Sequence, residues 1–135
     1  MNIHIRNIIA IIVGVFIGAL VNMGIVSLGP YVIPPPEGVD LTHLDSLKEN
    51  MLLLEPKNFI FPFLAHALGT LVGAFVAVKI AVKHHTLCAL IVGITFLIGG
   101  TLMIRMVGGP VWYIATDLIF AYLPMAYLGR KLAKK

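Results

Sequence analysis

Charged side chains are scarce in this chain: Asp, Glu, Lys and Arg together make up 12% of its 135 residues. Soluble domains carry about 25%, so half of the usual charge is missing. Hydrophobic residues make up 59% instead, and a soluble fold of this size has no interior large enough to hide them. The shortage of charge therefore excludes a cytosolic globular enzyme, a disordered chain and a nucleic-acid-binding module.

Cysteine is almost absent as well, because Cys88 is the only one, and no disulfide framework can form within the chain. Catalytic signatures such as G-x-S-x-G, H-E-x-x-H or a phosphate loop are missing too. His84, His85 and Cys88 offer too few ligands for a metal site. We therefore expect no metal, no cofactor and no enzymatic activity.

Long apolar runs are what the chain does have. A helix that crosses a bilayer needs roughly 20 apolar residues, and in lipid it must satisfy its backbone hydrogen bonds internally. Four such runs cover residues 8–28, 59–82, 86–107 and 111–128. The connections at 83–85 and 108–110 are so short that the helices they join must be antiparallel neighbours. The sequence predicts an all-α membrane protein, a single domain over residues 1–135 with four transmembrane helices in an antiparallel bundle.

The distribution of Lys and Arg predicts the orientation of these spans. With the N-terminus in the cytoplasm, the inner flanks hold seven basic residues and the outer flanks hold three, Lys48, Lys57 and Arg105. Cytoplasmic flanks of membrane proteins are enriched in Lys and Arg. The seven inner ones are Arg6, Lys79, Lys83, Arg130, Lys131, Lys134 and Lys135. We expect a multi-pass protein of a bacterial inner membrane with both termini in the cytoplasm.

The first outer loop, residues 29–58, is the one long connection. It contains three consecutive prolines, residues 34–36, which favour a stiff extended segment. Thr42 and Asp45 then fit a helix-start signature, and leucines follow at helical spacing. A short amphipathic helix is expected to lie across the outer mouth of the bundle. It is either a lid over apolar helix ends or a docking surface for a partner.

Small residues recur every four positions in the first two spans. The first span carries Gly14 and Gly18, and the second carries Gly69 and Gly73. Residues four apart share one helix face, and small residues let membrane helices approach closely. These stripes pack the first two helices together, or else form the seam of an oligomer or a groove for a partner.

Each span also delivers one polar side chain to the outer half of the bundle. Asn22, His66 and Asp117 lie about 9–10 Å below the outer helix ends, and Arg105 lies closer to the surface. A charge within the bilayer costs about 2.5–3.5 kcal/mol, so Asp117 must have a partner. Arg105 is the natural candidate and His66 the alternative. The four residues form either a structural network or a small polar pocket suited to a proton, an ion or a polar solute.

Aromatic residues gather near the expected membrane boundaries and predict interfacial belts. The outer belt contains Tyr31, Phe59, Phe61, Phe63, Trp112 and Tyr113, and the inner belt contains Tyr122 and Tyr127.

Several short motifs resemble a small uncharacterised family of bacterial four-helix integral membrane proteins. They are Pro34-Pro35-Pro36-x-Gly38-x-Asp40, Ala65-His66-x-x-Gly69-x-x-x-Gly73, Pro110-x-Trp112-Tyr113 and Pro124-x-Ala126-Tyr127-Leu128-Gly129. The resemblance implies the four-span fold and transfers no activity.

Two functional hypotheses follow from the sequence. The first is a non-enzymatic accessory or interaction protein that acts through helix packing and its outer loop, in contact with the lipid bilayer and another membrane protein. The second is a small transporter or channel, a homo-oligomer that uses Asp117, His66 and Arg105. Neither involves nucleic acid.

Overall fold

The computed structural model describes residues 1–135 and is 80% helical, with no strands. The elements in chain order are α1 (Ile3–Val32), α2 (Leu44–Asn50), η1 (Met51–Leu53), η2 (Pro56–Phe59), α3 (Ile60–Ile80), α4 (His85–Val107), α5 (Val111–Phe120) and α6 (Leu123–Leu132). The segments long and apolar enough to cross a membrane are Ile3–Val32, Pro56–Ile80, His85–Val107 and Val111–Leu132. The expectation of an all-helical chain with four such segments is confirmed, and these segments fit a membrane protein.

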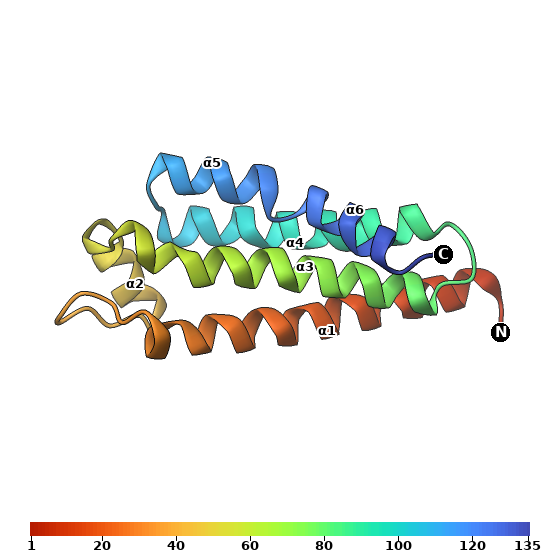
Figure 1. Ribbon diagram of the computed structural model, residues 1–135, viewed down its shortest axis with the longest axis horizontal. Coiled ribbons are helices and arrows are strands. Elements are labelled where there is room, and N and C mark those ends of the chain that lie inside the picture. Colours follow the sequence, from red (N-terminus) through yellow and green to blue (C-terminus); the bar gives the residue numbers. More distant parts are fainter.

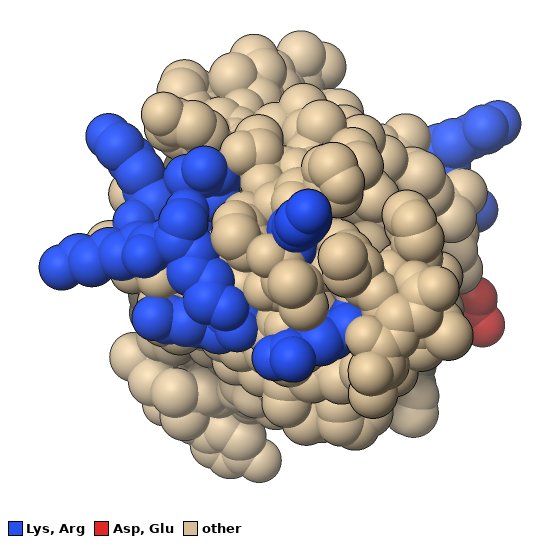
Figure 2. Space-filling model, turned by 90° about the vertical axis from the view of Figure 1, so that its right-hand side faces the viewer, with Lys and Arg blue, Asp and Glu red and all other residues tan.

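The long helices α1, α3 and α4 run along the long axis of the molecule, and the chain reverses direction between α1 and α3 and again between α3 and α4 (Figure 1). Both termini lie at one end, together with the turn at residues 81–84 (Figure 1). We call this the basic end, because Lys and Arg side chains gather on its face (Figure 2). The opposite end carries residues 33–59, which we call the lid.

Helices α1 and α3 touch backbone to backbone along the two glycine stripes. A Cβ atom added to Gly14 would lie 2.5 Å from the carbonyl oxygen of Gly73, and one added to Gly18 would lie 2.5 Å from that of Gly69. The reverse additions are also too close, at 2.9 Å for Gly69 and 2.8 Å for Gly73. The stripes therefore face each other within one chain, where only glycine fits.

The fourth membrane-length segment is broken into two helices, where the sequence predicted one helix over residues 111–128. Helix α5 ends at Phe120, and α6 begins at Leu123 with Pro124 in its first turn. Proline has no backbone N–H to donate to the carbonyl four residues earlier, so a continuous helix would lose a bond at Phe120. After the break, α6 packs on α3 and α4.

The half of the molecule nearer the basic end has a tightly packed core of small apolar side chains. These are Ala74, Ala77, Val78, Ala89, Val92, Ala126 and Ala133, each almost completely buried. Small side chains allow α3, α4 and α6 to approach closely. These helices therefore pack directly against one another in this half of the molecule.

The helix of the lid begins differently from the sequence expectation. Thr42 does not cap α2: its backbone N–H and hydroxyl both donate to Asp40, at 2.8 and 2.6 Å. These bonds hold the pKa of the Asp40 carboxyl below its ordinary value. Helix α2 is short and has no buried residue. The lid is held instead by Met51 and Phe59, which pack on Val107 and Tyr113.

Candidate functional site

His66 on α3 and Asp117 on α5 meet at hydrogen-bonding distance. The Nδ1 atom of His66 lies 2.7 Å from Oδ1 of Asp117. The Asp117 side chain is only 1% exposed, whereas the His66 side chain remains 22% exposed. A buried carboxylate next to a partly exposed imidazole is a polar pair with one side accessible to a ligand.

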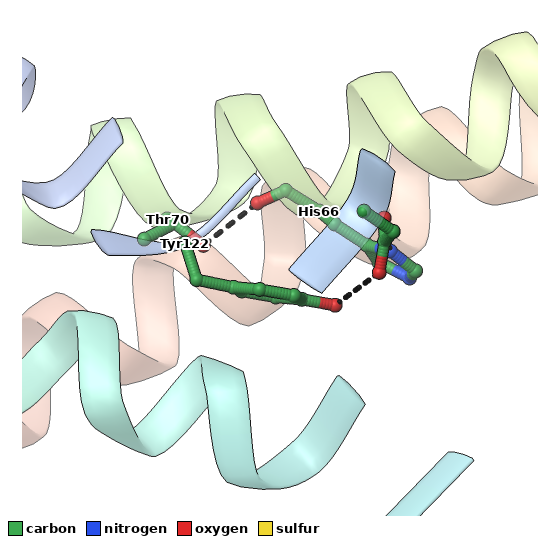
Figure 3. Close-up of polar contacts among 4 residues, drawn as sticks. His66, Thr70 and Tyr122 are labelled. Carbon is green, nitrogen blue, oxygen red and sulfur yellow. Dashed lines mark hydrogen bonds and ion pairs between the residues drawn. The ribbon is translucent and has the colours of Figure 1, made fainter. Parts of the chain in front are cut away.

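Tyr122 completes this pair, and the sequence did not assign it here. Its hydroxyl donates to Oδ2 of Asp117 at 2.8 Å, and its ring stacks on His66 at a centroid distance of 5.8 Å (Figure 3). The expectation of an interfacial belt position is wrong for Tyr122, which is fully buried. Residues five apart do not share a face of a regular helix, so the break between α5 and α6 is what lets Tyr122 reach Asp117. In the sequence, Pro124, two residues after Tyr122, is the feature that could have indicated this break.

The neighbouring helices shape the space around Tyr122. Gly100 on α4 lies directly against the Tyr122 hydroxyl, because a Cβ atom there would collide with it. Thr70 on α3 donates its hydroxyl to the backbone carbonyl of His66 at 2.7 Å (Figure 3). The three-residue network therefore depends on α3, α4 and the α5–α6 break together.

The hydrogen bonds leave one atom of the network free. Both carboxylate oxygens of Asp117 have a partner, and Nδ1 of His66 is occupied. Nε2 of His66 has no hydrogen-bond partner within the chain. It accepts a hydrogen bond when the ring is neutral with the proton on Nδ1, and it donates one when the ring is protonated.

Arg105 and Asn22 do not belong to this network, contrary to expectation. Arg105 is exposed and forms no ion pair with Asp117 or any other carboxylate. Its long side chain starts near the end of α4, where it can extend toward the surface. Asn22 on α1 lies against Gly69, and its buried Oδ1 atom has no partner. Of the four polar residues singled out in the sequence, the structure brings together only His66 and Asp117.

A cavity of about 170 Å³ lies beneath the lid, with His66 and Asp117 in its wall. Both residues are six positions into their helices, about 9 Å from the lid end, so they form the deep part of the cavity. Most of the remaining wall is apolar and comes from α1, α3, α4 and the lid. It includes Val26, Ile33, Leu47, Met51, Leu54, Phe59, Phe61, Met103, Ile104, Val107 and Tyr113. Lys57 and Asn58 also line the cavity, but Lys57 is paired with Glu55 and the Asn58 amide is bonded to the backbone of Glu55 and Pro34. Unpaired polar contacts are therefore available to a ligand mainly at His66.

Aromatic rings close the lid end of the cavity. Phe59 lies 4.6 Å from the ring of Tyr113, and Trp112 meets Phe59 edge-on at 5.5 Å. Phe59 and Tyr113 are buried, so their rings pack inside the protein, where the sequence predicted an interfacial belt. Tyr31 and Trp112 remain exposed.

In comparisons with known proteins, no family model, curated protein or solved structure matches this chain. The site is therefore defined by its own geometry, which combines a hydrogen-bonding pair at the deep end with an apolar chamber under a lid. Such an arrangement suits the binding of a small molecule with a polar group at one end.

Proposed function

We propose that this chain is a non-enzymatic accessory protein of a bacterial inner membrane that binds a small molecule in the cavity beneath its lid. The observation that carries the proposal is the position of His66 and Asp117, which is bonded to Tyr122, at the deep end of a mostly apolar cavity. Ligand sites are concave and mostly apolar, with a few placed polar groups that fix the orientation of the ligand.

The proposed setting is an antiparallel bundle in the membrane, with the basic end in the cytoplasm. Large apolar side chains are exposed along α1 and α4, for example Ile12, Phe16 and Ile98, which suits contact with lipid tails. The seven Lys and Arg residues of the basic end support this orientation, since cytoplasmic flanks carry such residues. The lid and the cavity mouth would then face the outer side.

A pocket is better supported than a channel. The core around Val78 and Val92 fills the half of the bundle nearer the basic end, so one chain has a cavity that is closed on that side. The glycine stripes of α1 and α3 pack against each other, so they are not free to contact a second copy or a partner helix. A transporter would require an oligomer with a path between chains, which remains the second hypothesis.

The test is native mass spectrometry of the full chain, purified in mild detergent, to detect a retained small molecule. Ile104→Phe introduces bulk into the cavity wall, and Ile98→Phe is the matched control, because Ile98 lies on the same helix and is exposed. We expect the wild type and Ile98→Phe to retain the molecule and Ile104→Phe to lose it. Equal retention in all three, or retention in none, would contradict the proposal.

A further inference from the structure

We propose that the ligand of this cavity is a lipid-soluble quinone or quinol, a six-membered ring with two oxygens and a hydrocarbon tail. This inference rests on the proposed function and names its ligand class. It follows from three separate features of the cavity: its size and aromatic wall, the free ring nitrogen of His66, and an opening toward lipid.

The size and wall of the cavity suit one ring. An apolar cavity of about 150 Å³ is large enough to bind benzene, and this one measures about 170 Å³. Phe59, Phe61 and Tyr113 contribute aromatic faces or edges, and Met51 and Met103 contribute thioether groups. Aromatic rings and methionine sulfur both make favourable contacts with a further ring.

The polar end of the cavity suits an oxygen on that ring. With Nδ1 of His66 held by Asp117, the free Nε2 atom can accept from a quinol hydroxyl. When the His66 ring is protonated, Nε2 can donate to a quinone carbonyl, and the Asp117 carboxylate balances the charge. The same pair can thus hold either form of the ligand without rearrangement.

The tail has a route into the bilayer. Val26 on α1 and Met103 on α4 line the cavity and are also 43% and 37% exposed on the molecular surface. Both helices are among the membrane-length segments, so in the proposed setting these two side chains face lipid. A tail attached to a ring in the cavity can leave between these side chains.

A phospholipid fits this cavity less well than a quinone does. Its acyl chain would bury the Nε2 atom of His66 without a hydrogen-bond partner, which costs free energy. The cation at the cavity mouth, Lys57, lies 3.3 Å from the carboxylate of Glu55 and is therefore already paired. Neither end of the cavity matches the polar group of a phospholipid.

The chain carries its own reporter for a binding experiment. Trp112 is the single tryptophan and contacts Phe59, which lines the cavity. Decylubiquinone, titrated into the full chain in detergent, should quench the Trp112 fluorescence with saturation. Quenching should saturate equally in Ile98→Phe and lose its saturable part in Ile104→Phe. Decylbenzene has the ring and tail but no oxygen. Its dissociation constant, measured by competition, should be at least about tenfold higher than that of decylubiquinone.

His66→Leu tests the hydrogen bond directly. We expect it to weaken decylubiquinone binding by about tenfold and to leave competition by decylbenzene unchanged. Circular dichroism melting establishes that the variant folds. If it does not, His66→Met is measured by the same criterion, because methionine fills the site without a strong hydrogen-bonding group.

The outcomes separate the ligand class from the proposed function. If decylbenzene binds as tightly as decylubiquinone and His66→Leu changes neither, the cavity binds apolar rings without recognising oxygen. That result overturns the quinone assignment and leaves the proposed function standing. If decylubiquinone shows no saturable quenching and the native mass spectra show no retained molecule, both proposals fail.

Discussion

At the scale of single residues, Asp117 is the group that is most costly to bury, because its carboxyl group lies inside a membrane-length segment. A charge there costs about 2.5–3.5 kcal/mol on insertion scales. His66 and Tyr122 provide a hydrogen bond to each of its oxygens. Removal of one partner leaves a buried polar group unsatisfied, so the loss of any one member should destabilise the whole network.

A double-mutant cycle tests whether Asp117 and His66 are coupled. Asp117→Asn and His66→Phe should each lower the free energy of unfolding in detergent by about 1–3 kcal/mol. The double variant should lose about 0.5–3 kcal/mol less than the sum, because the two residues share one interaction. Thermal melting monitored by circular dichroism gives the values.

Arg105 supplies the control for this cycle. Since it is exposed and unpaired, Arg105→Leu should change stability by no more than about 0.5 kcal/mol and should be additive with Asp117→Asn. Coupling of Asp117 to Arg105, together with additivity to His66, would show that the carboxylate has a different partner.

Gly100 provides a second residue-scale prediction. Gly100→Ala should displace the Tyr122 hydroxyl from Asp117 and cost about 1–3 kcal/mol, because a buried hydrogen bond to a charged group is lost. Gly99→Ala is the matched control, since a Cβ atom at Gly99 meets open space. The melting temperatures of the two variants are compared. An equal effect of both substitutions would show that Tyr122 does not contribute to the network.

At the scale of helices, the contact between α1 and α3 depends on the absence of side chains. Gly14→Ala should lower the free energy of unfolding by about 1–3 kcal/mol, as overpacking does, because its Cβ would meet the Gly73 carbonyl oxygen. Gly24→Ala on the same helix should be neutral or stabilise by up to about 1 kcal/mol, since its surroundings are open and alanine favours helix. Thermal melting of both variants measures the difference. Equal tolerance of both would mean that α1 and α3 are not in close contact.

The sequence predicts these helices well because their signals are local. Apolar run length locates the four membrane-length segments, and four-residue spacing locates the facing glycines. The pairing of polar side chains is not a local property. Depth along each helix placed Arg105 near Asp117, but rotation of the helix about its own axis decides which side chain faces inward, and α4 turns Arg105 outward.

The break in the fourth segment is the clearest feature that local sequence patterns could not predict. Apolar residues continue through 121–123, so hydropathy alone predicts one helix. Pro124 can be accommodated in a membrane helix as a kink, or it can start a new helix. The close packing of Gly129 on α3 accompanies the second outcome here, and contacts of this kind are visible only in three dimensions.

At the scale of the whole molecule, the two ends differ in chemistry. The basic end gathers seven cationic residues and a closely packed core, and the other end has the lid and the cavity. This asymmetry gives the bundle one closed side and one accessible side. The proposed capture of a ligand from the outer side requires only this asymmetry.

Cysteine labelling tests the proposed orientation. In a Cys88→Ala background, Leu52→Cys places a thiol at a lid position that is 90% exposed. It should react with a membrane-impermeant maleimide in cells with a permeabilised outer membrane, whereas Lys134→Cys should react only after lysis. The reverse pattern would invert the topology.

Accessibility within α4 is the most direct test of the central claim, that an open cavity lies beneath the lid and a closed core lies beyond it. In the same background, Ile104→Cys places a thiol in the cavity wall and Val92→Cys places one in the packed core. The rate of reaction with a small water-soluble thiosulfonate is measured on the folded protein and again after denaturation. We predict that Ile104→Cys reacts readily in the folded state and that Val92→Cys reacts only once the protein is denatured. An unreactive Ile104→Cys, or equal rates at both positions, would contradict the account.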